Sequence, residues 1–157
     1  MTRPQRVAHV VINVTDLEQS RRFYCDGLGM ATSGAFEGQM LFLYFGEQGE
    51  APHPFYHDLA LYRVDAPAAD DFRKRSGMNH VALLMRGPQD VDAAAERMRR
   101  LGFTVLKGPE VHKEDGYRYA YVQDPDRNVV ELVAPTEATA KLAHSGGATE
   151  SRATPSP

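Results

Sequence analysis

Two histidines and one glutamate interrupt segments that otherwise have the composition of apolar β-strands. His9 lies in "VAHVVINV", His80 in "MNHVALLM" and Glu131 in "NVVELVAP". Burying an imidazole or a carboxylate costs free energy unless the group is paired. Two imidazoles and a carboxylate form the facial triad of non-heme Fe(II) sites, and the same donors can hold Mn(II) or, in a hydrolytic site, Zn(II). The alternative at each position is a core side chain satisfied by hydrogen bonds.

Three further polar side chains could act on a bound substrate. His57 opens the segment "HDLALYRV", and His112 and Tyr121 lie nine residues apart in "EVHKEDGYRYAYV". Tyr121 precedes Glu131 by ten residues, an even number, which favours one face of a sheet if the register is unbroken across the turn "QDPDRN". The alternatives are surface histidines and a tyrosine that packs in a sheet.

The chain contains an internal repeat that relates the two histidines. Residues 6–34 can be laid over residues 77–108, and both stretches begin with an apolar strand that carries one histidine. His9 and His80 therefore occupy matching positions. If a pseudo-twofold axis relates the repeats, the two imidazoles should face one point.

Each repeat predicts the elements that must position these side chains. The helices should begin near Asp16 and Asp90, where an acid suits the positive helix terminus, and end at Leu28-Gly29 and Leu101-Gly102. The strands that follow are "ATSGAF", "MLFLYFG" and "HDLALYRV" in the first half, and "TVLKGPEV", "RYAYVQDP" and "NVVELVAP" in the second. The pattern predicts an α+β fold in which two tandem βαβββ repeats form a cupped mixed sheet around a metal site.

The domain organisation follows from the same repeats. We predict one domain over residues 1–135, made of repeats 6–64 and 78–135 joined by "DAPAADDFRKRSG". Residues 136–157 are small and polar with little apolar patterning, which is typical of a flexible tail.

Composition excludes several classes of partner. The 157 residues are 42% hydrophobic and 25% charged, with a net charge of −3 and no basic face for nucleic acid. Apolar runs have strand length, so no membrane span or signal peptide is expected. The single cysteine, Cys25, cannot form an intramolecular disulfide and suits a reducing cytoplasm. Open sheet edges favour a homo-oligomer, a dimer or larger.

The doubled layout resembles the vicinal oxygen chelate superfamily, and the site residues resemble the catalytic half of type I extradiol ring-cleavage dioxygenases. The resemblance covers residues 6 to about 135. It implies metal ligands at His9 in "AHVVINV", His80 in "NHVAL" and Glu131 in "VVELV", an acid–base histidine at His57 in "HDLAL", and catechol-contacting groups at His112 and Tyr121.

The activity implied by this resemblance is Fe(II)-dependent cleavage of a catechol ring with O2, with Mn(II) as the alternative metal. His57 would accept a substrate proton and later donate one as the ring opens, a role that suits a group titrating near neutral pH. Tyr121 would hydrogen-bond one catechol oxygen, and His112 would steady the neighbouring oxygen or the bound dioxygen.

Two other functions use the same layout. One is a glyoxalase- or epimerase-type metalloenzyme with Ni, Zn or Co, and the other is a small-molecule-binding protein like the bleomycin-resistance proteins, which lack the triad. In glyoxalase I each repeat supplies a glutamate. The last strand of the first repeat here offers no match to Glu131, only Asp58 beside His57, and this argues against a glyoxalase. Large dioxygenases have four repeats, so this chain resembles a one-domain version.

Overall fold

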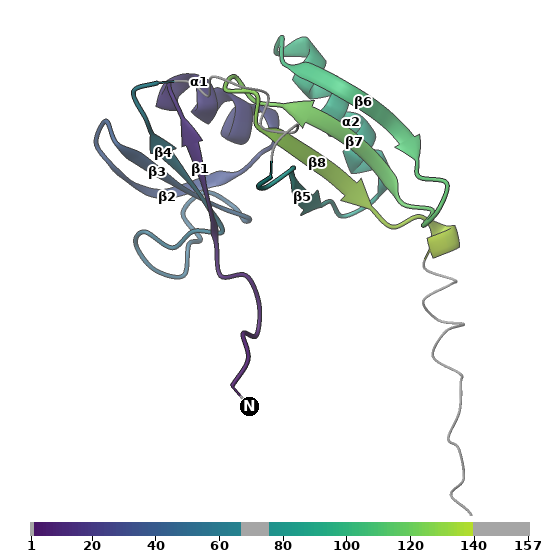
Figure 1. Cartoon of the computed structure of the whole chain (residues 1–157), viewed down its shortest axis with the longest axis horizontal. Helices are drawn as coiled ribbons and strands as arrows, with labels where there is room; N and C mark the ends of the chain where they lie inside the picture. The colour runs from purple at the N-terminus through teal and green to yellow at the C-terminus, as the bar shows by residue number, and fades with distance from the viewer. Residues whose placement is uncertain (1, 67–75, 140–157) are drawn as a thin grey trace, which may run out of the picture.

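The computed structural model describes residues 2–66 and 76–139, which form two four-stranded sheets, each with its own helical segment (Figure 1). This arrangement confirms the predicted α+β fold of two tandem βαβββ repeats. Part of the predicted connector (67–75) and most of the predicted tail (140–157) lie outside the described residues. The elements are β1 (Val10–Val14), α1 (Leu17–Arg21), the π-helical η1 (Arg22–Gly27), β2 (Ala31–Phe36), β3 (Met40–Tyr44), β4 (Leu59–Arg63), β5 (Val81–Leu84), α2 (Pro88–Arg100), β6 (Thr104–Val111), β7 (Arg118–Gln123) and β8 (Val129–Ala134).

The two sheets have the same strand order, β1-β4-β3-β2 and β5-β8-β7-β6. In each sheet the first and last strands of the repeat pair in parallel, with Val10 opposite Leu59 in one and Val81 opposite Val130 in the other. The remaining pairs are antiparallel. This shared register makes residues 59 and 130 equivalent, and therefore 60 and 131 as well.

The helices begin and end close to the residues that the sequence predicts. The first helix differs from the prediction in its middle, where α1 gives way to η1. The Asp16 side chain caps α1 by accepting from the backbone N–H groups of Glu18 and Gln19. Gly29 and Gly102 adopt φ of 79° and 83° just after the helices, a conformation that favours glycine. Where one α-helix was predicted to continue, η1 has wider π-helical turns, and these bury the consecutive aromatic residues Phe23 and Tyr24.

Alternation along the strands divides each sheet into two faces. Ile12, Leu59 and Leu61 in the first sheet, and Leu83 and Leu132 in the second, join the helices in one hydrophobic core. The intervening side chains point to the opposite side, which we call the outer face of each sheet. Every strand residue discussed below as part of the candidate site lies on an outer face.

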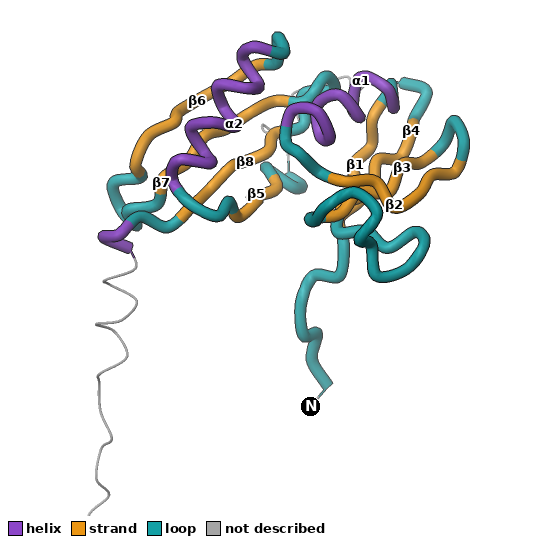
Figure 2. Tube along the Cα trace, turned by 180° about the vertical axis from the view of Figure 1, so that it is seen from behind, coloured by secondary structure: helices purple, strands orange, loops and turns teal. Residues whose placement is uncertain are grey.

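The helical segments of the two halves pack against each other, as the view from behind suggests (Figure 2). A Cβ on Gly27 would overlap Met98 of α2, so glycine permits this close approach, and Arg97 Nε donates to the Gly27 carbonyl at 2.7 Å. The Asp126 carboxylate accepts from the backbone and hydroxyl of Thr15, at 2.9 and 2.6 Å. No helix in the described part of the chain is long and apolar enough to cross a membrane.

Candidate metal and substrate site

His80 and Glu131 form a pair on the outer face of the second sheet. His80 Nε2 lies 3.0 Å from Glu131 Oε2, and the two side chains are 30% and 18% exposed. His80 directly precedes β5 and Glu131 lies in β8, and these strands pair in parallel. The parallel register therefore brings an imidazole and a carboxylate together from positions 51 residues apart.

Both ring nitrogens of His80 have polar neighbours. His80 Nδ1 lies 2.9 Å from Asn79 Oδ1, and this contact orients the ring so that Nε2 faces the Glu131 carboxylate. Ligand atoms about 2.1 Å from a small divalent ion and at right angles to each other are about 3.0 Å apart, so the pair fits two adjacent metal ligands.

Tyr121 stands beside this pair. It is the cross-strand partner of Glu131, and its ring lies 5.4 Å from the His80 ring, centroid to centroid. The predicted shared face of Tyr121 and Glu131 agrees with this register. Burial raises the pKa of Tyr121, and the Glu131 carboxylate, which is hydrogen-bonded to the phenol, raises it further. Tyr121 therefore stays protonated at neutral pH and can donate a hydrogen bond.

His9 and His57 form a second pair at the edge of the first sheet. Their ring centroids are 4.5 Å apart, and the Phe42 ring lies 4.8 Å from that of His57. His9 precedes β1 and His57 precedes β4, so their proximity comes from the parallel pairing of these strands. His57 Nδ1 lies 2.8 Å from the Phe55 carbonyl oxygen, which can only accept, so the free nitrogen is Nε2.

The structure does not assemble the predicted triad within one chain. Among residues 2–66 and 76–139, no group of three or more His, Cys, Asp or Glu side chains could hold a metal ion. His9 is exposed and lies with His57 rather than with His80 and Glu131. The expectation that both imidazoles face one point is therefore not met in the single chain. Both histidines also lie just before their strands, not in the middle of buried sheet as expected.

His112 is separate from the other predicted residues. It follows β6 in an exposed loop, with Nδ1 3.2 Å from Glu114 Oε2 and 3.3 Å from Asp115 Oδ1. Its ring contacts Tyr119, whose ring in turn contacts Tyr121, at 5.5 Å in both cases. The acids of its own loop hold the imidazole, and Tyr119 is its link to the site.

The strand register shows which residue of the first half lies at the position equivalent to Glu131. Ala60 in β4 is equivalent to Glu131 in β8, because Val10 pairs with Leu59 as Val81 pairs with Val130. Asp58 is not the counterpart of Glu131, and its carboxylate accepts from Phe45 N and Tyr56 Oη. The first half thus contributes histidines and no acid at this position.

Sequence reasoning missed three residues that support these pairs: Asn79, Phe42 and Phe55. Asn79 could have been noticed as a polar neighbour of His80. Phe42 resembles any apolar strand residue, and the contact of the Phe55 carbonyl depends on a loop conformation that the sequence pattern does not report.

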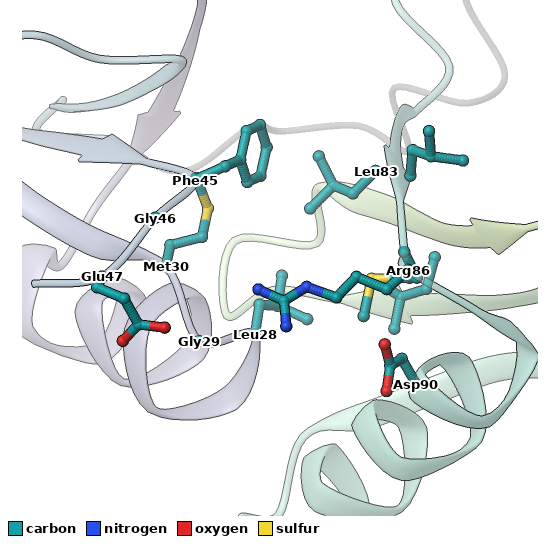
Figure 3. Close-up of a pocket in the computed structure, with 12 residues that line it drawn as sticks. Leu28, Gly29, Met30, Phe45, Gly46, Glu47, Leu83, Arg86 and Asp90 are labelled. Carbon is teal, nitrogen blue, oxygen red and sulfur yellow. The ribbon is translucent and has the colours of Figure 1, made fainter. Parts of the chain in front are cut away.

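A separate cavity of about 330 Å³ lies between the two halves, and none of the predicted site residues lines it (Figure 3). Its wall combines apolar side chains with charged ones, and Arg86 extends into the gap from the second half while Glu47 faces it from the first. Volume alone does not mark this cavity as the reactive centre, because the paired imidazoles and the carboxylate lie elsewhere.

Comparison with known proteins places this chain in a family. The family model described as the Glyoxalase/Bleomycin resistance protein/Dioxygenase superfamily matches residues 6–132. The chain belongs to this superfamily, which includes metal-binding enzymes as well as resistance proteins.

The relatives carry different activities. Biphenyl-2,3-diol 1,2-dioxygenase 2 of Rhodococcus globerulus is 32% identical over 151 residues, which cover 90% of this chain and 72% of that protein. A probable lactoylglutathione lyase of Synechocystis sp. is 29% identical over 132 residues, covering 80% and 92%. A mutant of the fosfomycin resistance protein FosX from Listeria monocytogenes, solved with Mn(II) and 1S,2S-dihydroxypropylphosphonic acid, has the same fold with a TM-score of 0.63, 18% identity and coverage of 88% and 98%.

Proposed function

We propose that this protein is an Fe(II)-dependent extradiol dioxygenase, which cleaves the aromatic ring of a catechol with O2. The observation that carries the proposal is the asymmetry of the repeats. The second half supplies His80 and Glu131, whereas the first supplies His9 and His57 and has Ala60 in place of a second glutamate. One carboxylate and two histidine ligands suit the facial triad, and the additional histidine suits an acid–base role.

The relatives support both this proposal and its rival. The dioxygenase of Rhodococcus globerulus has the higher identity, 32% against 29%, whereas the probable lactoylglutathione lyase of Synechocystis sp. is matched over 92% of its own length against 72% for the dioxygenase. The similarity to the probable lactoylglutathione lyase supports the alternative, a lyase-type activity. Against it stands Ala60, because a glyoxalase site uses a glutamate from each repeat.

The chain's own residues would divide the work as follows. Tyr121, which keeps its proton, donates a hydrogen bond to one catechol oxygen once that oxygen displaces its contact with Glu131. His57, with Nδ1 held by the Phe55 carbonyl, accepts a catechol proton at Nε2 and returns one as the ring opens. His112 takes no direct part in the proposed contacts with catechol, since its ring contacts Tyr119, which in turn contacts Tyr121.

His9, His80 and Glu131 would hold the metal. Fe(II) there supplies a chelating centre for the two vicinal oxygens and activates O2. His80 Nε2 and Glu131 Oε2 face each other at 3.0 Å, a separation that suits two adjacent metal ligands. Mn(II) is the alternative ion, and the FosX structure with Mn(II) illustrates metal binding on this fold.

A second copy of the chain would complete the site. The His9–His57 pair and the His80–Glu131 pair lie on different sheets of one chain, and helices occupy the opposite faces of both sheets. A twofold dimer can place the His9–His57 edge of one chain against the His80–Glu131 face of its partner, twice over. Val11 and Leu84, 45% and 76% exposed on the outer faces, would gain apolar cover in such a contact.

An assay of metal and substrate in combination tests the function. Protein loaded with Fe(II) under nitrogen should, when air is admitted, convert catechol to a ring-opened product with a new visible absorbance. Protein loaded with Ni(II) or Zn(II) should not isomerise the methylglyoxal–glutathione adduct. Isomerisation without any ring cleavage would assign the lyase activity and overturn the proposal.

A further inference from the structure

The cavity between the two halves has the size of a small-molecule site. Its volume of about 330 Å³ lies at the lower end of the range of ligand pockets, which is about 300–1,000 Å³. None of the residues assigned above to the metal or to catechol lines it. A ligand bound here would be a small molecule held apart from the proposed reactive centre.

Apolar side chains from both halves line part of this cavity. They are Leu28, Met30 and Phe45 from the first half and Leu83, Met85 and Leu132 from the second (Figure 3). All of them except Phe45 belong to the hydrophobic core or pack against it, and Phe45 is 58% exposed beside them. An apolar group in the cavity would therefore extend the core and cover Phe45, and such burial gains free energy.

Three charged side chains stand around the same cavity. Arg86 follows β5 and extends into the gap, Asp90 lies in the first turn of α2, and Glu47 faces them from the loop after β3 (Figure 3). All three are exposed, and within residues 2–66 and 76–139 none of them forms an ion pair or a side-chain hydrogen bond. The cavity thus presents one positive and two negative groups that are not paired with one another.

The signs of these groups indicate the kind of ligand. A carboxylate suits Arg86, because a guanidinium can bind it through two parallel hydrogen bonds. A simple carboxylic acid would bring its negative charge beside Glu47 and Asp90, however, and a simple amine would bring a positive charge beside Arg86. A ligand that carries both a carboxylate and an ammonium group is complementary to all three side chains.

We propose that the cavity between the halves binds an apolar α-amino acid. Its carboxylate contacts Arg86, its ammonium group lies between Glu47 and Asp90, and its side chain packs against Phe45 and Leu83. Because both halves supply contacts, the bound amino acid holds the halves together and stabilises the folded protein. This inference goes beyond the proposed function and does not depend on it, since it uses no residue of the metal or catechol site.

The ligand class is tested with L-leucine and three of its fragments, by calorimetry on metal-free protein because amino acids also chelate metal ions. 4-Methylpentanoate lacks the ammonium group, 3-methylbutylamine lacks the carboxylate, and glycine lacks the apolar group. L-Leucine should bind saturably at millimolar concentration, and each fragment should bind more weakly by about tenfold or more. Equal affinity for L-leucine and a singly charged fragment would overturn the recognition of a zwitterion. Saturable binding of neither L-leucine nor L-phenylalanine would overturn the site.

Substitutions that remove one charge test the individual contacts. Arg86→Gln should weaken L-leucine by about tenfold or more without weakening 3-methylbutylamine, and Glu47→Gln should weaken both of these ligands without weakening 4-methylpentanoate. Arg100→Gln is the matched control, because it removes an exposed arginine at the other end of α2 that pairs with Glu96, and it should bind like wild type. Full L-leucine affinity in Arg86→Gln would overturn the carboxylate contact.

NMR of ¹³C-labelled methionine methyl groups tests where the ligand binds. L-Leucine should shift the signals of Met30 and Met85, which line the cavity, and not that of Met40, which begins β3. Shifts confined to other methionines would overturn the location.

An ion pair between Arg86 and Glu47 is the alternative use of these charges. In that case Arg86→Gln and Glu47→Gln should destabilise the protein non-additively in urea, and no amino acid should bind. That result would overturn the proposal, whereas a rise in the unfolding temperature with L-leucine that Arg86→Gln abolishes would support it.

Discussion

Glu131 is the side chain whose chemistry most needs a metal ion. It is 18% exposed and faces Nε2 of His80 at 3.0 Å. Without its carboxylate, the site retains imidazoles that bind Fe(II) far more weakly than the full donor set.

We therefore expect Glu131→Ala to lose high-affinity iron binding. Anaerobic titration of the metal-free wild type should saturate near about one Fe(II) per chain, whereas the variant should show no saturable binding in the same range. Glu110→Ala, on the same sheet and paired with Lys107 rather than with a histidine, is the matched control and should bind like wild type. Full iron retention by Glu131→Ala would remove the carboxylate from the metal site.

His57 should be required for turnover and not for metal binding. His57→Phe keeps a flat ring against His9 and Phe42 but has no group that can take a proton. Removing a general acid–base group typically slows catalysis by on the order of 10²-fold or more, and we expect that loss in kcat with iron and catechol binding retained. His53→Phe changes another histidine of the same loop and should leave kcat unchanged; equal rates for both variants would make His57 an ordinary surface histidine.

At the scale of elements, the turn between β7 and β8 ties the two halves together. The buried Asp124 carboxylate accepts from Tyr24 Oη at 3.2 Å and from the backbone N–H and side-chain amide of Asn128 at 2.7 and 2.9 Å. Burial raises the pKa of Asp124 to about 6, although these hydrogen bonds oppose the shift.

This raised pKa predicts a pH dependence of stability with a definite sign. The folded state holds the Asp124 proton more tightly than the unfolded chain, so this group adds stability as the pH falls through 6 and loses that contribution as the pH rises. Asp124→Asn stays neutral throughout. The free energy of unfolding can be measured in urea for both proteins at pH 5 and pH 7. Relative to wild type, Asp124→Asn should be more stable at pH 7 than it is at pH 5, by on the order of 1 kcal/mol. Parallel pH profiles would contradict the shift.

Local patterns predicted most of these elements, and contacts distant in sequence account for the differences. Strand alternation and the Leu-Gly helix ends fixed the repeat, and the even spacing from Tyr121 to Glu131 correctly gave their shared face. The separation of His9 from Glu131 depends on how the halves pack, through Gly27 against Met98 and Tyr24 against Asp124. Such contacts leave no periodic pattern in the sequence. The equivalence of Ala60 and Glu131 could be recognised only from the strand register of the structure.

At the scale of the whole molecule, the two half-sites predict a dimer with sites shared between chains. Light scattering at micromolar concentration should give a dimer mass. His9→Ala and Glu131→Ala should each be inactive alone. Mixed by unfolding and refolding together, they should form heterodimers in which one site has both defects and the other is intact, restoring about a quarter of wild-type activity.

A site formed within one chain gives a different result for the same mixture. Every site would then lack either His9 or Glu131, and activity would stay at background. A monomer mass, or a mixture with no recovered activity, would therefore contradict the shared site while leaving the assignment of the ligands open to the iron titration.

The most direct test of the dioxygenase proposal is the stoichiometry of O2 uptake. An oxygen electrode and product analysis together should show one O2 consumed for each catechol lost, with both oxygen atoms entering a ring-opened product when Fe(II)-loaded protein is present. Metal-free protein and Glu131→Ala should consume none. Catechol that binds but survives in air with iron present, or O2 uptake that yields no ring-opened product, would contradict the account.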